Sequence, residues 1–344
     1  MSKRAASLLP SSYMNALLLK EYMQLELSAM PEPEIAADEV LIRVRACGIC
    51  GSDVHGLDGS TGRRIPPLVM GHEAAGEVAA LGANVRGLRV GDRVTFDSTI
   101  YCGECSYCAR GEINLCDNRQ VMGVSPGPYR RHGAFAEYVA VPRRIVYKLP
   151  NGLSFEQAAL IEAVSVAMHG VNLTPVRLGD TAVVVGAGMI GVLAVQCLRA
   201  AGCARVIAVD PVEQRLAMAR ELGATDTFTA AQNFNADVCL ECVGNKEAVR
   251  AAIGSVRKGG AVTLVGNVSP TVELPLQDVV SRQIRLQGSC ASCGEYPAAI
   301  DLMARGVIRV DPLISAVAPL AEGAHWFGKL YRREGNLIKV ILQP

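Results

Sequence analysis

Aromatic residues and net charge are both scarce in this chain. Phe, Tyr and Trp make up 5% of the 344 residues, so Val, Leu, Ile and Ala have to form most of the core. Acidic and basic residues are interspersed and nearly cancel, which leaves a formal net charge of +1. Because nucleic-acid-binding proteins carry a basic surface, we expect no nucleic-acid partner.

Long hydrophobic runs are also missing. The most apolar stretch, residues 182–195, contains glycines and is shorter than the roughly 18 residues of a membrane-spanning helix. We therefore expect no membrane partner. Residues 1–13 lack the apolar segment and cleavage site of a secretion signal. We expect them to be a disordered extension, or translation to start at Met14; a short transit-like tail is the alternative.

Two patterns divide the chain. In the first 150 residues, short alternating segments such as 38–47 (DEVLIRVRAC) are separated by Gly and Pro, which is typical of a β-rich barrel. From about residue 165, apolar strands alternate with helices, which predicts a parallel, doubly wound sheet. We expect an α/β protein with a catalytic barrel domain over 1–160, to which 296–344 returns, and a sheet domain over 161–295. The expected strands of the sheet are 180–188, 205–210, 236–244, 259–266 and 284–289, and its first two helices are 189–202 and 211–223.

The stretch GAGMIG places Gly186, Gly188 and Gly191 between a predicted strand and a predicted helix. This context favours a dinucleotide-binding turn over a purely structural one, since the helix start can bind a pyrophosphate. Asp210 ends the second strand and would accept hydrogen bonds from a ribose, which favours NAD over NADP. Arg215 has two open interpretations, contact with adenine and a solvated helix face. The other residues expected at the cofactor are Met189, Ile190, Val243, Val265 and Gly266.

The chain has 12 cysteines. Without a secretion signal we expect a cytoplasmic protein, in which thiols stay reduced and clustered cysteines indicate metal binding or catalysis. Cys102, Cys105, Cys108 and Cys116 have the spacing C-x2-C-x2-C-x7-C. Four thiolates fill a tetrahedral zinc shell, so we expect a structural zinc; an iron–sulfur cluster is the alternative with the same ligands. Apart from these four and Cys50, the cysteines are expected to be small buried hydrophobes: Cys47, Cys197, Cys203, Cys239, Cys242, Cys290 and Cys293.

A second cluster combines different ligand types. Cys50, His72 and Glu73 lie in the segments 46–56 and 71–85, with Ser52, Asp53 and His55 close to Cys50 in sequence. Mixed sulfur, nitrogen and oxygen ligands are typical of catalytic zinc, which keeps one position open. We therefore expect two zinc ions per chain, one structural and one catalytic.

The segment Gly71–Val85 has the pattern GHE-x2-G-x5-G-x2-V. It resembles the signature of zinc-containing alcohol dehydrogenases of the medium-chain dehydrogenase/reductase superfamily, and the cysteine segment, the glycine turn and Asp210 follow in that family's order. The resemblance implies a GroES-like β-barrel catalytic domain and a Rossmann domain. Residues 159–170 (ALIEAVSVAMHG) resemble the sorbitol (polyol) dehydrogenase segment that supplies a glutamate ligand, here Glu162, although Ala163 replaces the usual Pro.

The expected activity is transfer of a hydride from a secondary alcohol of a polyol, or of its phosphate, to NAD, which gives a ketose. Cys50, His72 and Glu162 would hold the catalytic zinc, and Glu73 would lie beside it and exchange with water or Glu162. Ser52 would take the hydroxyl proton and pass it to His55 or the ribose. His169 is expected to be a packed core residue. The alternatives are oxidation of a β-hydroxy amino acid, as in threonine dehydrogenases, a non-catalytic cofactor-binding protein, and a zinc-free quinone reductase. The resemblance implies a homodimer or homotetramer.

Overall fold

The computed structural model describes residues 12–125 and 131–344. Most of the segment expected to be an extension, residues 1–11, lies outside this range. Tyr13, which the prediction placed in the extension, is the first residue of strand β1 (Tyr13–Glu21).

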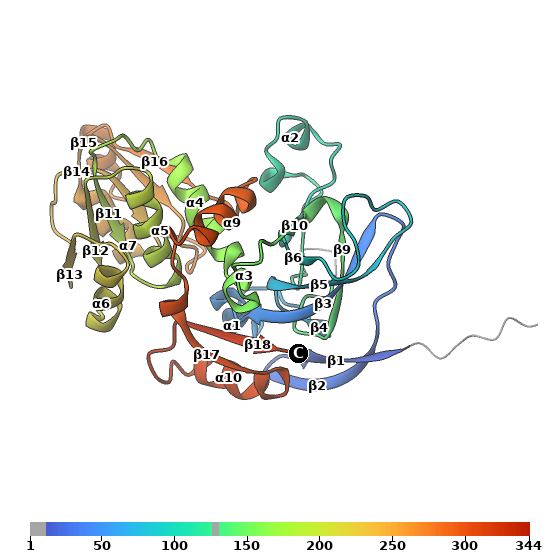
Figure 1. The fold of residues 1–344 in the computed structure, drawn as a ribbon. Coiled ribbons are helices and arrows are strands. Elements are labelled where there is room, and N and C mark those ends of the chain that lie inside the picture. Colours follow the sequence, from blue (N-terminus) through green and yellow to red (C-terminus); the bar gives the residue numbers. More distant parts are fainter. Residues whose placement is uncertain (1–11, 126–130) are drawn as a thin grey trace, which may run out of the picture.

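The first part of the chain forms antiparallel sheets that curve into a barrel (Figure 1). Its central strand is β3 (Glu39–Gly48), whose apolar positions alternate as predicted and which pairs with β5 (Glu73–Leu81) and β9 (Tyr138–Pro142). The other strands of this part are β2 (Gln24–Pro31), β4 (Leu68–Val69), β6 (Arg93–Phe96), β7 (Thr99–Ile100), β8 (Gln120–Val121) and β10 (Val146–Lys148). Short helices lie in its loops: α1 (Gly51–Gly56), α2 (Ser106–Ala109), η1 (Ile113–Leu115) and η2 (Arg143–Ile145).

The second part is a six-stranded sheet in which every pair of neighbours is parallel, in the order β13-β12-β11-β14-β15-β16. The strands are β11 (Thr181–Val185), β12 (Arg205–Val209), β13 (Asp226–Phe228), β14 (Ala236–Glu241), β15 (Val256–Leu264) and β16 (Arg285–Gly288). The helices between them are α5 (Met189–Ala200), α6 (Glu213–Glu221), α7 (Lys246–Ser255) and α8 (Leu276–Ser281). The strand order reverses between β11 and β14, and in such sheets the ligand crevice lies at the carboxyl ends of these two strands.

The two parts are joined by helices and by the end of the chain. Figure 1 shows α4 (Ile161–Leu173) and α9 (Tyr296–Ala304) between the barrel and the parallel sheet. After α9, the last strand β18 (Lys339–Gln343) pairs with β3 on one side and with β17 (Ile314–Pro319) on the other. The remaining elements are α3 (Phe155–Ala159), η3 (Asp311–Leu313), η4 (Leu320–Glu322) and α10 (Gly323–Tyr331).

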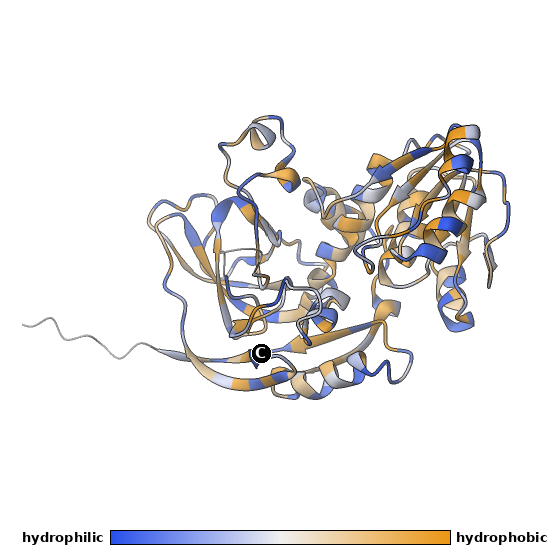
Figure 2. Ribbon diagram, turned by 180° about the vertical axis from the view of Figure 1, so that it is seen from behind, coloured by the Kyte–Doolittle hydropathy of each residue, from blue (hydrophilic) through white to orange (hydrophobic). Residues whose placement is uncertain are grey.

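Aliphatic side chains form most of the core, as the composition predicts. One buried cluster fills the barrel, and two others cover the two faces of the parallel sheet. In Figure 2 the strands of the parallel sheet are mostly hydrophobic, whereas the surrounding helices carry hydrophilic patches. Few aromatics take part, but Phe96, Phe135, Phe327 and Tyr296 are fully buried. Within residues 12–125 and 131–344, no helix has the length and apolar character required to cross a bilayer.

Candidate metal centres and cofactor site

Cys50, His72 and Glu73 meet although they come from two separate segments. Cys50 immediately precedes α1, and Glu73 opens β5, where it pairs with Gly48 of β3. One ligand atom from each of the three residues lies within 4.8 Å of the other two. A thiol, an imidazole and a carboxylate at this spacing match the donor set of a catalytic zinc site, so these residues fit a zinc ion.

A buried carboxylate supports His72. Asp53 is fully buried on α1, and its Oδ1 lies 3.4 Å from His72 Nδ1, which leaves Nε2 as the nitrogen free to bind a metal. Arg64, also buried, donates from Nη2 to Asp53 Oδ1 at 2.9 Å. Burial would raise the pKa of Asp53, but His72 and Arg64 outweigh burial and lower this pKa to about 2. Asp53 is therefore held between His72 and Arg64.

Glu73 is paired with a lysine from the far end of the chain. Lys339, on β18, donates from Nζ to Glu73 Oε2 at 2.5 Å and to the Ile49 carbonyl at 3.1 Å. The two side chains are 3% and 2% exposed, so this is a buried ion pair. Sequence reasoning missed Lys339; the available signal was a single charged residue in the otherwise apolar strand KVIL.

Glu162 lies close to this centre but outside the group of three. It is in the first turn of α4, and its Oε1 is 3.5 Å from Ser98 Oγ. Burial raises the pKa of Glu162 to about 7; the neighbouring His72 charge opposes this shift, and Glu73 and Asp97 add to it. In this arrangement Glu73, rather than Glu162, supplies the oxygen that completes the three-ligand group.

Ser52 lies next to the metal-ligand candidates. Its Oγ donates to Cys50 Sγ at 3.2 Å and accepts from Arg64 Nη2 at 3.0 Å. Arg64 thus contacts both Ser52 and Asp53, a connection that the sequence analysis missed. His55 lies on the exposed side of α1, one turn beyond Ser52.

The four clustered cysteines form a second group. The Sγ atoms of Cys102, Cys105, Cys108 and Cys116 all lie within 4.8 Å of one another, around the single turn of α2. None of the 12 cysteines forms a disulfide. Backbone N–H groups of Glu104 and Cys105 point at Cys102 Sγ and lower the pKa of this thiol to about 6. Four converging sulfurs with N–H donors behind one of them fit a tetrahedral zinc ion.

The cysteines outside the clusters differ partly from expectation. Cys47, Cys197, Cys203 and Cys239 are buried, as predicted. The prediction was wrong for Cys242, Cys290 and Cys293, which are only half-buried, because they follow strands β14 and β16 rather than lying inside them.

Each glycine of the GAGMIG turn has the geometry that a dinucleotide site requires. Gly186 has φ +93°, and a Cβ there would lie 2.4 Å from Val243 Cγ2. At Gly191, a Cβ would lie 1.7 Å from the Gly186 carbonyl oxygen, so only glycine allows this contact. A Cβ at Gly188 would meet no protein atom within 4 Å, which leaves space at the start of α5. Met189 and Ile190 form that first turn, which no side chain caps, so its N–H groups remain available to a phosphate.

Two buried acidic residues, Asp210 at the end of β12 and Glu241 at the end of β14, accept hydrogen bonds from backbone N–H groups of the nearby turns. Asp210 is 3% exposed and accepts from the N–H groups of Ala187 and Val212, both at 2.9 Å. Arg215 Nη1 lies 3.4 Å from Asp210 Oδ2, and about half of its side chain is exposed. Glu241, which the sequence analysis missed, is fully buried at the end of β14.

Glu241 Oε1 accepts from the N–H groups of Val243 and Gly244, at 2.8 and 2.7 Å. Gly266 packs on this turn, because a Cβ there would lie 2.2 Å from Gly244 N. Val265 contacts α4, where a Cβ on Gly170 would lie 2.9 Å from Val265 Cγ2. The structure therefore brings the expected cofactor residues Val243 and Gly266 next to the glycine turn.

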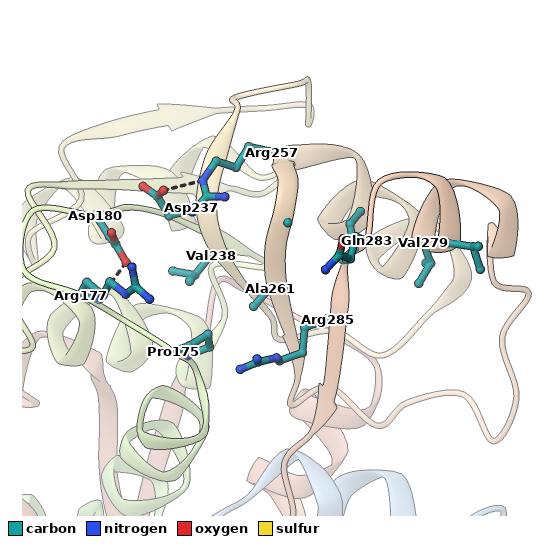
Figure 3. A pocket seen from close by; sticks show the side chains of 13 residues that line it. Pro175, Arg177, Asp180, Asp237, Val238, Arg257, Ala261, Val279, Gln283 and Arg285 are labelled. Carbon is teal, nitrogen blue, oxygen red and sulfur yellow. Dashed lines mark hydrogen bonds and ion pairs between the residues drawn. The ribbon is translucent and has the colours of Figure 1, made fainter.

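A separate cavity of about 760 Å³ lies at the opposite edge of the parallel sheet (Figure 3). Arg177, Asp237, Arg257 and Arg285 are among its lining residues, at or near the amino ends of the strands. Asp237 accepts hydrogen bonds from Arg257 Nε at 2.8 Å and from the Thr181 N–H at 2.9 Å. The cavity contains none of the metal-ligand candidates or turn residues described above and is not part of this site.

Comparison with known proteins agrees with this geometry. Residues 36–151 match the model of the alcohol dehydrogenase GroES-like domain, and residues 190–305 match that of zinc-binding dehydrogenases. The chain is 32% identical to sorbitol dehydrogenase of Bacillus subtilis, covering 96% of this chain and 97% of that one. It is 34% identical to D-arabitol-phosphate dehydrogenase of Enterococcus avium, covering 94% of each. A zinc-binding dehydrogenase of Sinorhizobium meliloti, solved with NADP bound, superposes with a TM-score of 0.89 at 33% identity, covering 97% of this chain and 100% of that one. The chain therefore belongs to the zinc-containing medium-chain dehydrogenase/reductase superfamily, in its sorbitol (polyol) dehydrogenase-like subgroup.

Proposed function

We propose that this enzyme oxidises a secondary hydroxyl of a polyol or sugar alcohol, free or phosphorylated, to the ketone, with NAD as the hydride acceptor. The observation that carries the proposal is the group formed by the half-buried Cys50 and the buried His72 and Glu73, with the half-buried Glu162 beside it. A glutamate-type metal site distinguishes polyol dehydrogenases from simple alcohol dehydrogenases in the family resemblance.

We assign the catalytic zinc to Cys50 and His72, with Glu73 and Glu162 as exchanging carboxylate ligands, and the structural zinc to the four clustered cysteines. The catalytic zinc, when bound, would lower the pKa of a substrate hydroxyl far below its ordinary value. Lys339 holds one oxygen of Glu73 and leaves the other free. Asp53 fixes the ring of His72, so the protein presents its donors in one orientation.

Ser52 is placed to accept the substrate hydroxyl proton. Its own hydrogen now points to Cys50 Sγ and has to turn away for a relay, while the Arg64 bond keeps Oγ in position. As Ser52 Oγ takes the substrate proton, the serine proton leaves toward His55 or the cofactor ribose and then solvent. NAD⁺, when bound, would accept the electron pair of the carbinol C–H bond as hydride, which would leave a ketone and NADH.

The preference for NAD rests on Asp210. Its buried carboxylate ends β12, and the next residue is Pro211 rather than a base. A 2′-phosphate would lie against this negative charge, whereas a 2′-hydroxyl could donate to it. Because a structural relative was solved with NADP, both cofactors belong in the test.

The test is a substrate panel read by absorbance of the reduced cofactor. Sorbitol, xylitol, arabitol, arabitol phosphate and threonine would each be tried with NAD⁺ and with NADP⁺, with and without a chelator. We expect turnover of at least one polyol with NAD⁺ and its loss after chelation. Turnover of threonine alone would show a β-hydroxy amino acid dehydrogenase, and no turnover of any alcohol would contradict the proposal.

We further propose that the enzyme is a homodimer or homotetramer that works in the cytoplasm. β16 is an edge strand of the parallel sheet, and in the segment between β15 and β16 Val268, Leu276 and Val280 are between 62% and 71% exposed. Unpaired strand edges beside apolar side chains favour pairing with a second chain. Twelve free cysteines support a reducing compartment.

A further inference from the structure

Three buried polar side chains are not accounted for by the chemistry above. Asn114, His169 and Glu295 are 6%, 7% and 7% exposed. They come from three different elements: Asn114 from η1 between Cys108 and Cys116, His169 from α4, and Glu295 from the residue that precedes α9. His169 Nδ1 lies 2.8 Å from Glu295 Oε1, and its Nε2 lies 3.3 Å from Asn114 Nδ2. We call these three residues the junction.

The hydrogen bonds of the junction define how the Asn114 amide and the His169 ring are oriented. Asn114 Nδ2 donates to the Cys290 carbonyl at 2.8 Å, so the amide nitrogen, and not its oxygen, faces this side. Since an amide nitrogen only donates, His169 Nε2 has to accept from it, and the ring proton is on Nδ1. This proton is donated to Glu295 Oε1, whose carboxylate also accepts from Asn172 Nδ2 and the Cys293 N–H. His169 thus bridges an amide and a carboxylate.

The junction attaches the cysteine segment to residues 289–296, which link β16 to α9. Arg119 Nη1 donates to the Asn114 carbonyl at 2.9 Å and lies 3.1 Å from Cys290 Sγ. Cys293 Sγ donates to the Gly111 carbonyl at 3.1 Å. Segments 111–119 and 290–295, about 170 residues apart in sequence, are therefore joined at several points by short polar contacts.

The same contacts reach the catalytic centre through α4. His169 follows Glu162 by seven residues, which is two helical turns, so both lie on one face of α4. Tyr296 follows Glu295 directly; it is fully buried and stacks on Tyr147 with ring centroids 5.1 Å apart. A shift of the cysteine segment would consequently move both the loop 289–296 and the helix that carries Glu162.

We propose that Asn114 is a positioning residue that couples the folded cysteine segment to α4 and to the loop 289–296. Asn114 donates two hydrogen bonds, and through them the cysteine segment sets the placement of Glu162. Asn114 contributes to turnover in this way without touching substrate. The kinetic consequence rests on the proposed function, whereas the structural coupling does not.

The experiment compares Asn114→Ala and Asn114→Asp with Ser106→Ala, a change at an exposed residue of the same segment. The aspartate keeps the shape of Asn114 but lacks the amide donors, so it separates the effect of the lost hydrogen bonds from the effect of lost packing. If the alanine variant does not fold, the aspartate variant alone tests the proposal. Amide hydrogen exchange of residues 161–164 and 289–296 is measured on the full chain, together with zinc content, kcat and KM.

With zinc content unchanged, we expect both Asn114 variants to exchange about five times faster or more in the two segments, and Ser106→Ala to match the wild type. On the substrate identified by the panel, kcat should fall about tenfold with little change in KM. Unchanged exchange in both Asn114 variants would overturn the coupling, even if no substrate is found. Faster exchange with unchanged kcat would overturn its role in turnover alone.

Discussion

A buried ion pair beside the catalytic centre contributes to the stability of the fold. Lys339 and Glu73 form an ion pair that is almost inaccessible to water. Removing one partner of such a pair leaves an unpaired buried charge, so Lys339→Met should lower the free energy of unfolding by about 3 to 5 kcal/mol. Urea unfolding measures this loss. The double variant Lys339→Met/Glu73→Gln should recover at least half of it; a single variant as stable as the wild type would show that the pair contributes nothing.

A second buried carboxyl makes stability depend on pH. Asp97 is 2% exposed, its Oδ1 accepts from the Thr99 N–H at 2.8 Å, and burial raises its pKa to about 7. The folded protein therefore binds a proton that the unfolded chain releases above about pH 4, and stability from this group falls as pH rises from about 4 to about 7.

Asp97→Asn removes this titration. Compared with the wild type, the variant should gain up to about 2 to 4 kcal/mol of stability between pH 5 and pH 8, measured by urea unfolding at both values. Asp38→Asn, which changes an exposed carboxylate, is the control. An identical pH dependence in Asp97→Asn and the wild type would contradict the assignment.

At the scale of elements, the turn between β11 and α5 allows a matched pair of substitutions. A methyl group at Gly188 meets open space, whereas one at Gly191 would collide with the Gly186 carbonyl. Gly188→Ala should keep its melting temperature but bind NADH at least about tenfold more weakly, because the methyl group occupies the space for the phosphates. Gly191→Ala should lose both stability and binding. Thermal unfolding and NADH fluorescence titration separate the two outcomes, and unchanged NADH affinity in Gly188→Ala would contradict the phosphate site.

Elements with continuous or alternating apolar patterns were predictable from the sequence. The predicted strands at 38–47 and 205–210 correspond to β3 and β12, because burial of one or both faces imposes a periodic pattern. β13 was not predicted, since its three residues are only partly buried and show no period. β1 was not predicted either, although Ala16, Leu17 and Leu19 are fully buried in it.

Some residues of the candidate site were predictable from the sequence and others were not. The segment around His72 and the spacing of the four cysteines indicated metal centres, because ligands that are close in sequence can converge locally. Arg64 and Lys339 carried no such pattern. Their roles arise from tertiary contacts, with Asp53 and Ser52 for one and with Glu73 for the other, and these contacts depend on loop and strand positions that periodicity does not report.

For the whole molecule, the testable question is assembly. Leu276→Asp/Val280→Asp places two charges on α8, the helix that precedes the edge strand β16. We expect this variant to have a lower molar mass than the wild type in size-exclusion chromatography with light scattering. Val90→Asp is the control, because Val90 is 64% exposed but lies in the barrel part of the chain. A wild-type protein that is monomeric would contradict the oligomer, and an unchanged mass in the double variant would place the interface elsewhere.

The bond between Lys339 and Glu73 also affects how the protein is made. The two residues are 266 positions apart, and at about 5 to 20 residues per second the ribosome needs roughly ten seconds to a minute to cover that distance. Throughout this interval, Cys50, His72 and Glu73 have already been synthesised while the strand that completes their surroundings has not. A nascent chain can therefore fold its cysteine segment early, but its catalytic pocket has to remain open until synthesis is nearly finished.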